Sequence, residues 1–340
     1  MKLHSKFLFI LSALAMTTQA QPVFVEGVSL ESGWYDCNKK QKWTWEAKPS
    51  SYYDGGFPDD SAMCWAHAAS NVLQWWQDAQ DPSLIPADAP DGKSDTAFSF
   101  YATVQGKLGQ QRIDDPLYVQ QLAIFKDIAK NWDNTGGKVM QAYNWYFNGG
   151  SLSSIEGTLR NPDSGGYYSD LGLVMNGNTS PLFTSFTFND SFTQTQIIDT
   201  LVGYIDNNYG TTLSLASKVG GGHAVTMWGY EIIGDDFFVY LTDSDDGQHA
   251  LIKQKVVFTD TKWAYLTACD GDTPVYKEEW VADLYDSAKI SINGVEQTIQ
   301  GILLSEAQAF TAPMLTVPEP ASTSMGLLAL SGLLLRRRRK

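Results

Sequence analysis

The sequence has 340 residues, of which 43% are hydrophobic and 18% are charged, a composition typical of a globular protein with a large core. Its formal net charge is −14, and the first and last 20 residues hold seven basic residues and no acid, so residues 21–320 carry −21. So acidic a body repels the phosphates of nucleic acids and of anionic lipids. The charge therefore excludes nucleic acid as an expected partner.

Residues 1–20 have the pattern of a secretory signal peptide. Lys2 and Lys6 precede an apolar run over residues 7–16, and a short polar stretch leads to Ala20. The run is too short to stay in a bilayer as a permanent span. The sequence predicts export, with a mature chain that begins at Gln21.

The first two thirds of the mature chain are predicted to be mainly helices and loops. Helices are expected where apolar residues recur at helical spacing, and loops where Gly, Pro and polar residues gather. In chain order we predict a loop-rich start (21–58), a helix (64–77), a polar loop (82–95), a helix that begins after Pro116 (117–132), an aromatic core segment (143–147), an irregular surface segment (148–180) and a further helix (194–208).

The last third of the chain is predicted to form strands. Its segments are rich in β-branched and aromatic residues and are separated by turn residues. Helices followed by a mainly antiparallel sheet indicate an α+β fold. We therefore predict one domain over residues 21–312, followed by a linker and tail over 313–340. The predicted strands are 211–216, 223–233, 237–242, 250–258 and 299–304.

Cys64 stands at the start of the helix predicted over residues 64–77. Asp59, Asp60 and Ser61 precede it and are expected to supply N-capping side chains. The positive end of a helix dipole favours the thiolate, which is the nucleophilic form of cysteine. A small buried cysteine in a core helix is the alternative interpretation.

The chain has three cysteines, Cys37, Cys64 and Cys269. In an oxidising compartment an odd number of cysteines leaves one thiol over. The simplest arrangement is a disulfide between Cys37 and Cys269, with Cys64 as the remaining thiol.

His223 is the best candidate for a general base among the histidines of the mature chain. It follows three glycines at 220–222, which let backbone or substrate approach closely, and it opens a predicted strand. His67 lies one helical turn after Cys64 and is expected to be structural, near the rim of the site. His249 follows a polar turn and is expected to be solvated.

Asp243 and Asp245 follow the strand that comes after His223. Two residues apart in an extended chain, they share a face. A carboxylate beside an imidazole fixes its tautomer and stabilises the imidazolium, so these acids complete a Cys-His-Asp set with Cys64. A solvated loop and a calcium-binding turn are the alternatives.

The hairpin between His223 and Asp243 has a geometry that can be predicted. Because side chains alternate along a strand, an even-length loop centred between Gly234 and Asp235 would turn Asp243 away from His223. We therefore predict an odd-length connection near Gly234, or a bulge between Gly234 and Asp243. Either device would bring the Asp243 carboxylate within hydrogen-bond reach of the His223 ring.

Four segments resemble the IdeS/Mac family of streptococcal IgG-degrading cysteine endopeptidases, and the similarity spans most of residues 28–306. They are Gly-Trp-Tyr-Asp-Cys-Asn-Lys at 33–39, the Cys64 helix ending in Asn-Val-Leu-Gln-Trp-Trp at 71–76, Gly-His-Ala-Val-Thr-Met-Trp-Gly at 222–229, and Thr-Asp-Ser-Asp at 242–245. The resemblance implies a papain-like fold in which the helical part carries the nucleophile and packs on a mainly antiparallel sheet that carries His and Asp.

The resemblance also implies a role for each site residue. Cys64 would be the nucleophile, His223 the base, Asp243 its orienting partner and Asp245 a supporting acid. The Lys39 side chain would donate to the oxyanion, together with the Cys64 backbone N–H. Lys40 and Lys42 lie close to Lys39 in the sequence. Trp65 replaces the small residue that the family carries after the nucleophile.

The C-terminus has the layout of a sorting tail. Pro318-Glu319-Pro320 precedes an apolar run over residues 321–335 and a basic cluster over 336–340. As a helix the apolar run would be about 22 Å long, shorter than the ~30 Å core of a bilayer. A plain membrane anchor is one interpretation. The layout resembles the PEP-CTERM tail of Gram-negative bacteria, which implies export to the cell envelope or beyond, transient retention in the membrane, and recognition and removal by an exosortase.

The sequence thus predicts a secreted cysteine endopeptidase that acts on a protein or peptide through an acyl-enzyme. An immunoglobulin is one candidate substrate, although no motif encodes that choice. The alternatives are a papain-clan transferase or amidase and a catalytically inactive surface-binding protein on the same fold. Motifs of serine hydrolases, zinc peptidases and P-loop proteins are absent from the sequence, and no cofactor or metal site is predicted.

Overall fold

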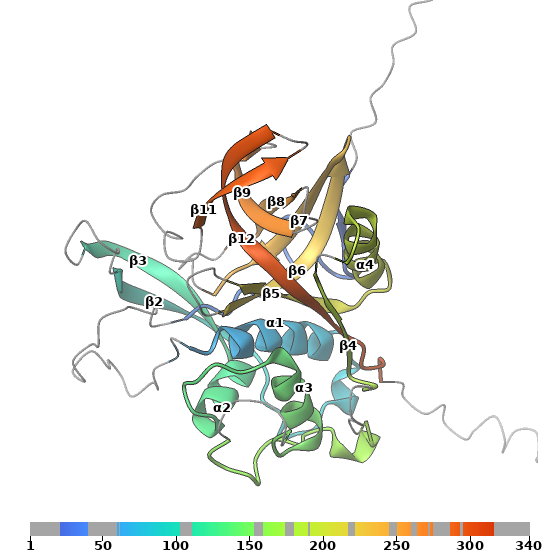
Figure 1. Cartoon of the computed structure of the whole chain (residues 1–340). Coiled ribbons are helices and arrows are strands. Elements are labelled where there is room, and N and C mark those ends of the chain that lie inside the picture. The colour runs from blue at the N-terminus through green and yellow to red at the C-terminus, as the bar shows by residue number, and fades with distance from the viewer. Residues whose placement is uncertain are drawn as a thin grey trace, which may run out of the picture.

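A layer of helices and a curved antiparallel sheet meet along one helix, α1 (Cys64–Asp78), in the computed structural model of this chain (Figure 1). The fold is α+β, as predicted. The structure describes residues 21–39, 60, 62–102, 111–152, 159–173, 180–189, 191–216, 222–244, 250–259, 264–270, 273–274, 286–292 and 295–315. The predicted signal peptide and the sorting tail lie outside these residues.

Among the described residues, six strands close into an antiparallel barrel. They are hydrogen-bonded in the order β9–β8–β7–β6–β5–β12, and β12 also pairs with β9, which closes the ring. Short strands extend it: β1 pairs with β6, β4 and β11 pair with β12, and β10 pairs with β9. The bounds are β1 (Val23–Phe24), β4 (Phe183–Thr187), β5 (Gly210–Ala216), β6 (Gly222–Ile233), β7 (Asp236–Thr242), β8 (Ile252–Phe258), β9 (Ala264–Asp270), β10 (Thr273–Pro274), β11 (Asp286–Ile292) and β12 (Val295–Phe310).

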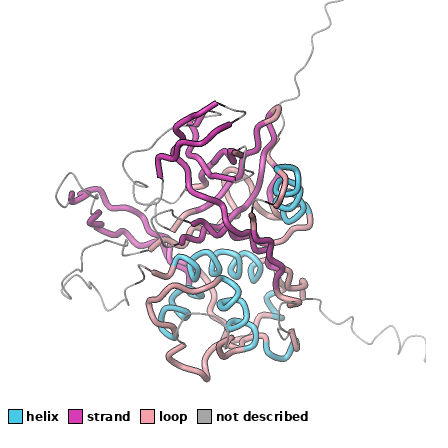
Figure 2. Tube along the Cα trace, viewed as in Figure 1, coloured by secondary structure: helices cyan, strands magenta, loops and turns pink. Residues whose placement is uncertain are grey.

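Two further helices cover the side of α1 that faces away from the barrel (Figures 1 and 2). They are α2 (Ala123–Asn131) and α3 (Val139–Asn148). A separate hairpin of β2 (Lys93–Ala102) and β3 (Gln111–Leu122) projects from this layer, and β3 runs directly into α2. Helix α4 (Gln194–Asp206) packs instead against β1, β5 and β6, and two short 3₁₀ helices, η3 (Pro82–Leu84) and η4 (Ser169–Leu171), lie in loops.

Helix α1 is buried without interruption from Trp65 to Gln77, because helices cover one side of it and the barrel covers the other. Its polar side chains are therefore hydrogen-bonded across the layers, as buried polar groups require. Asn71 Nδ2 donates to Thr226 Oγ1 of β6 at 3.1 Å, and the Thr226 hydroxyl donates to the Ala68 carbonyl at 3.3 Å. These bonds fix α1 along β6.

Most predicted elements are confirmed. The helices predicted over 64–77 and 194–208 are α1 and α4, and the first four predicted strands are β5 to β8, while 299–304 is the middle of β12. The aromatic segment at 143–147 is buried in α3. Asn148 is still the last residue of α3, and the other described residues of 148–180 form loops, one isolated β-bridge at Leu159 and the 3₁₀ helix η4.

The helix predicted over 117–132 is wrong in its first part. Residues 117–122 belong to β3, and the helix begins only at Ala123. Their partner is β2, which pairs with β3 and begins at Lys93, inside the predicted polar loop. Long-range pairing of this kind overrides a local periodicity that a strand and a helix can share over a few residues.

The chain returns to α1 at the C-terminal end of the described residues. The Leu315 N–H donates to Gln80 Oε1 at 2.7 Å, and Gln80 Nε2 donates to the Trp76 carbonyl in the last turns of α1. This attachment lies at the opposite end of α1 from Cys64. Within the described part of the chain, no helix combines the length and the apolar character that crossing a membrane requires.

Candidate active site

Cys64 is the first residue of α1, and its side chain is half-buried. The helix begins where the sequence predicted, but the predicted capping is wrong for Asp60. The N-cap residue is Met63, which makes no side-chain capping bond, and Asp60 contributes its carbonyl to the Met63 N–H. Asp59 and Ser61 lie outside the described residues. The first turn of α1 thus presents the positive end of its dipole at Cys64.

His223 and Asp243 form a close hydrogen bond. Nε2 of His223, the second residue of β6, lies 2.6 Å from Oδ1 of Asp243, which directly follows β7. The His223 side chain is 2% exposed and the Asp243 side chain 15%, so little water competes for the bond. The predicted contact between the Asp243 carboxylate and the His223 ring is confirmed.

A bulge at Trp228 produces this contact. Near the turn Ile233 pairs with Asp236, so the loop has two residues, Gly234 with φ +60° and Asp235, and the predicted odd-length loop is wrong. The register shifts between Met227 and Gly229, which places the extra residue in β6 rather than between Gly234 and Asp243. After the shift Thr226 pairs with Thr242, so Asp243 and His223 share a face.

The bulge is stabilised by the side chain and the carbonyl of its extra residue. Trp228 is fully buried, and its indole N–H donates to Thr242 Oγ1 at 3.0 Å. Its carbonyl accepts from the Val25 N–H at 3.0 Å. The indole N–H and the carbonyl of Trp228 are therefore both hydrogen-bonded.

The packing of α1 on the barrel brings Cys64 and His223 to the same end of the helix–sheet interface. Thr226 of β6 contacts Ala68 and Asn71 of α1. Gly210 of β5 stands next to the residue that pairs with Met227 of β6. It packs so tightly on α1 that a Cβ added to Gly210 would lie 2.5 Å from the Val72 side chain. Helix α1 and strand β6 therefore run in the same direction. From Asn71 back to Cys64 is about 10 Å of helix, and from Thr226 back to His223 is about 10 Å of strand.

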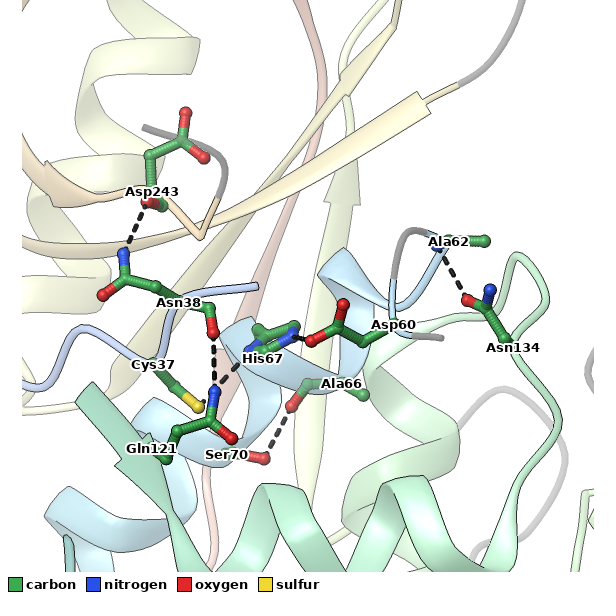
Figure 3. Close-up of polar contacts among 10 residues, drawn as sticks. All are labelled: Cys37, Asn38, Asp60, Ala62, Ala66, His67, Ser70, Gln121, Asn134 and Asp243. Carbon is green, nitrogen blue, oxygen red and sulfur yellow. Dashed lines mark hydrogen bonds and ion pairs between the residues drawn. The ribbon is translucent and has the colours of Figure 1, made fainter. Parts of the chain in front are cut away.

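The segment that contains Lys39 runs beside the loop after β7 (Figure 3). The Lys39 N–H donates to the Ser244 carbonyl at 2.9 Å, and Asn38 Nδ2 donates to the Asp243 carbonyl at 3.4 Å. Gln121 Nε2 donates to the Asn38 carbonyl at 2.8 Å. Lys39 is 3% exposed. The structure thus brings Lys39 next to Asp243, although 204 positions separate them in the sequence.

The predicted disulfide between Cys37 and Cys269 is wrong, because Cys37 is a buried thiol. Its backbone N–H donates to Asn71 Oδ1 at 2.9 Å, and its Sγ lies 3.3 Å from His67 Nδ1. Burial raises the pKa of the Cys37 thiol well above its ordinary value, and a nearby backbone hydrogen bond only partly opposes the shift. Cys37 is therefore protonated and inert at neutral pH.

His67 occupies a more central position than the sequence predicted. It is fully buried, and its Nε2 lies 3.5 Å from Asp60 Oδ2, while its ring stacks on Phe125 with centroids 3.6 Å apart. Cys37, His67 and Asp60 thus form a second Cys-His-Asp set that substrate cannot reach. The sequence offered the helical spacing of His67 from Cys64, but nothing that linked His67 to Cys37.

Several residues considered for the site on sequence grounds lie outside the part of the chain that the structure describes. Asp245, His249, Lys40 and Lys42 are among them. Within the described residues, no group of three or more His, Cys, Asp and Glu side chains is arranged to hold a metal ion.

Comparison with known protein families finds the PEP-CTERM protein-sorting motif at residues 316–340. The chain carries a PEP-CTERM sorting tail. This motif marks an exported protein that is held transiently through its C-terminal tail and processed by an exosortase, as the sequence predicted. The motif begins directly after Leu315, at the end of α1 that lies opposite Cys64. No curated protein matches the chain.

Proposed function

We propose that this PEP-CTERM protein is an exported cysteine endopeptidase with a papain-like arrangement of Cys64, His223 and Asp243. The observation that carries the proposal is the 2.6 Å hydrogen bond between His223 and Asp243, in a strand pair that packs along the helix that Cys64 begins. The bond requires a bulge, and it joins a buried histidine to a largely covered carboxylate, which a solvated acidic loop would not need. The four segments that resemble the IdeS/Mac family carry these same residues.

The orientation of the imidazole suits a thiol peptidase. A neutral His223 that donates its Nε2–H to Asp243 has Nδ1 as its basic nitrogen, and Nδ1 is the atom that would take the proton of Cys64. The carboxylate also stabilises the imidazolium that this transfer creates. The thiolate then sits at the N-terminus of α1, where the helix dipole favours negative charge.

The reaction follows from these positions. The Cys64 thiolate adds to the scissile carbonyl, and His223 protonates the leaving amine as the tetrahedral species collapses to a thioester. Water, deprotonated by His223, then releases the acid and restores the thiol. The Cys64 N–H and the Lys39 side chain are the proposed oxyanion donors, and one such donor typically lowers the barrier by about 3–4 kcal/mol.

The proposal is tested by combining a thiol probe with a peptide library. The wild type is treated with iodoacetamide at neutral pH and mapped by mass spectrometry, then incubated with a proteome-derived peptide mixture to find cleaved bonds. We expect selective alkylation of Cys64 and a set of cleavages that Cys64→Ala and His223→Ala both abolish. Asp206→Asn is a matched control, because Asp206 also accepts a side-chain hydrogen bond, from Tyr230 at 3.0 Å, far from Cys64 in the sequence.

Other outcomes of this test identify the alternatives. Selective alkylation of Cys64 without peptide cleavage, but with transfer to an added amine, would indicate a transferase or amidase on the same residues. An inert Cys64 and no cleavage would indicate a binding protein that retains the fold.

A further inference from the structure

The buried set of Cys37, His67 and Asp60 lies next to the proposed nucleophile. His67 is one turn beyond Cys64 on α1, and both of its ring nitrogens face a polar side chain. Figure 3 shows His67 between Cys37 on one side and Asp60 on the other. A buried imidazole has to be matched by such partners, because an unmatched polar group in a core costs free energy.

The protons of this set can be assigned from its surroundings. Cys37 keeps its proton at neutral pH, because burial raises the pKa of its thiol. In the neutral form, His67 would accept the thiol proton at Nδ1 and direct its Nε2–H toward the Asp60 carboxylate, which lies 3.5 Å away. In this arrangement neither ring nitrogen keeps a lone pair for the proton of Cys64, so His67 would not act as its base.

Each partner of His67 belongs to a segment that ends in the proposed site. Asp60 accepts the Met63 N–H at 3.0 Å, so it forms the turn that leads into Cys64. Cys37 precedes Asn38 and Lys39, whose amide groups bond the carbonyls of Asp243 and Ser244. His67 thus contacts both segments, and the bond from the Cys37 N–H to Asn71 Oδ1 of α1 at 2.9 Å is a second link between them.

We propose that His67 is a positioning residue of the active site, which joins the turn before Cys64 to the segment that carries Lys39. The inference rests on the proposed peptidase function, since positioning has a meaning only if Cys64 reacts. The positioning role concerns the distance between the Cys64 thiolate and the proposed oxyanion donor. The thiolate and one oxyanion donor approach the same carbonyl from two segments, and a shift of about 1 Å between such groups can lower a rate by about 100-fold.

The competing interpretation is that His67 only fills the core against Phe125. Three variants separate the two roles. His67→Phe keeps a stacking ring and removes the hydrogen bond to Cys37 and the polar contact with Asp60. His67→Asn places an amide near the Nδ1 position and can serve Cys37, whereas His67→Gln places one near Nε2 and can serve Asp60.

Ser70→Ala is the matched control. Ser70 is also fully buried on α1, but its hydroxyl donates to the Ala66 carbonyl of the same helix at 2.6 Å, so it joins no other segment. For every variant we would measure the thermal midpoint, the rate of Cys64 alkylation at pH 7, and kcat and KM on a cleaved peptide. Alkylation requires no peptide substrate and thus reports on the thiol itself.

We expect His67→Phe to lower kcat by about 10- to 100-fold with KM within threefold, and to slow the alkylation of Cys64 at least fivefold. Ser70→Ala should change neither rate, and at least one of the two amide variants should recover part of both. If His67→Phe does not fold, the two amide variants distinguish positioning from core filling, because each can keep one of the two contacts of His67.

Wild-type rates in the His67 variants, whatever their loss of thermal stability, would overturn the positioning role and leave the peptidase function standing. A wild-type Cys64 that neither reacts with iodoacetamide nor supports cleavage would instead reject the proposed function, and the inference would fall with it.

Discussion

Replacing Asp243 with a graded series tests how much the site depends on its carboxylate. A hydrogen bond to an ionised group contributes about 1.5–3 kcal/mol and a neutral one about 0.5–1.5 kcal/mol. Asp243→Asn keeps an oxygen that can accept from His223 Nε2 and removes only the charge. The difference between these two bond strengths, about 1–1.5 kcal/mol, predicts a loss of roughly 5- to 13-fold in kcat/KM.

Asp243→Ala removes the acceptor as well. The His223 side chain is 2% exposed, so water reaches its ring poorly, and a buried group that loses its partner costs about 1–3 kcal/mol more. The summed loss, about 2–4.5 kcal/mol, predicts a fall of roughly 30- to 2000-fold. The assay is kcat/KM on a peptide from the library, with Asp206→Asn and Asp206→Ala as controls. Equal activity of Asp243→Ala and the wild type, with Cys64→Ala inactive, would refute the role of the carboxylate.

Four further predictions concern other parts of the molecule. In the folded protein, iodoacetamide should modify Cys64 within minutes and Cys37 only after unfolding by denaturant, which peptide mapping would show; rapid modification of Cys37 would contradict its burial. The pKa of Cys37 in the folded protein lies above its unfolded value of about 9, so its contribution to stability is complete below pH 9 and is lost as the pH rises further. In the wild type the free energy of unfolding should therefore fall above pH 9, and Cys37→Ala should reduce that slope by up to about 1.4 kcal/mol per pH unit, measured by chemical denaturation. Lys39→Met should lower kcat about 100-fold at nearly constant KM if its side chain is an oxyanion donor, and Lys39→Arg should retain more activity; equal kcat in all three proteins would exclude that role. Protein from the native host should lack residues 1–20 and the 336–340 cluster in intact-mass analysis, and recovery of the full C-terminus would indicate a plain anchor.

Local sequence patterns predicted those parts of the fold that depend on local properties. Helix α1 contains no Gly or Pro and is rich in Ala, and β6 and β7 are rich in β-branched and aromatic residues. In these elements the local conformational propensity agrees with the tertiary structure. The prediction failed at residues 117–122, where the partner strand β2 decides the conformation. A window that covers only one strand of a hairpin holds no information about its partner.

The contact between His223 and Asp243 was predictable from the sequence, but the strand register that produces it was not. Cys64 and His223 stand in short motifs whose chemistry is local, and Asp243 follows the neighbouring strand. Which side chains of the hairpin share a face, however, depends on the bulge at Trp228. This bulge is stabilised because the Trp228 indole N–H donates to Thr242 and the Trp228 carbonyl accepts from Val25. Thr242 belongs to β7 of the same hairpin, but Val25 lies in a segment outside it, so a pattern within the hairpin alone could not indicate which strand carries the extra residue.

The buried Cys37-His67-Asp60 set beside the proposed Cys64-His223-Asp243 set shows why residue types alone do not identify a nucleophile. In both sets a thiol precedes an imidazole that faces a carboxylate. Cys37 stands at no helix terminus and is fully buried, so its anion would lose the surrounding water. A backbone hydrogen bond offsets only part of that loss, and the pKa of its thiol rises. Cys64 is half-buried and begins α1, so its anion would gain the helix dipole and keep part of its contact with solvent. Counting cysteines assigned Cys37 to a disulfide, whereas its surroundings show a buried thiol next to His67.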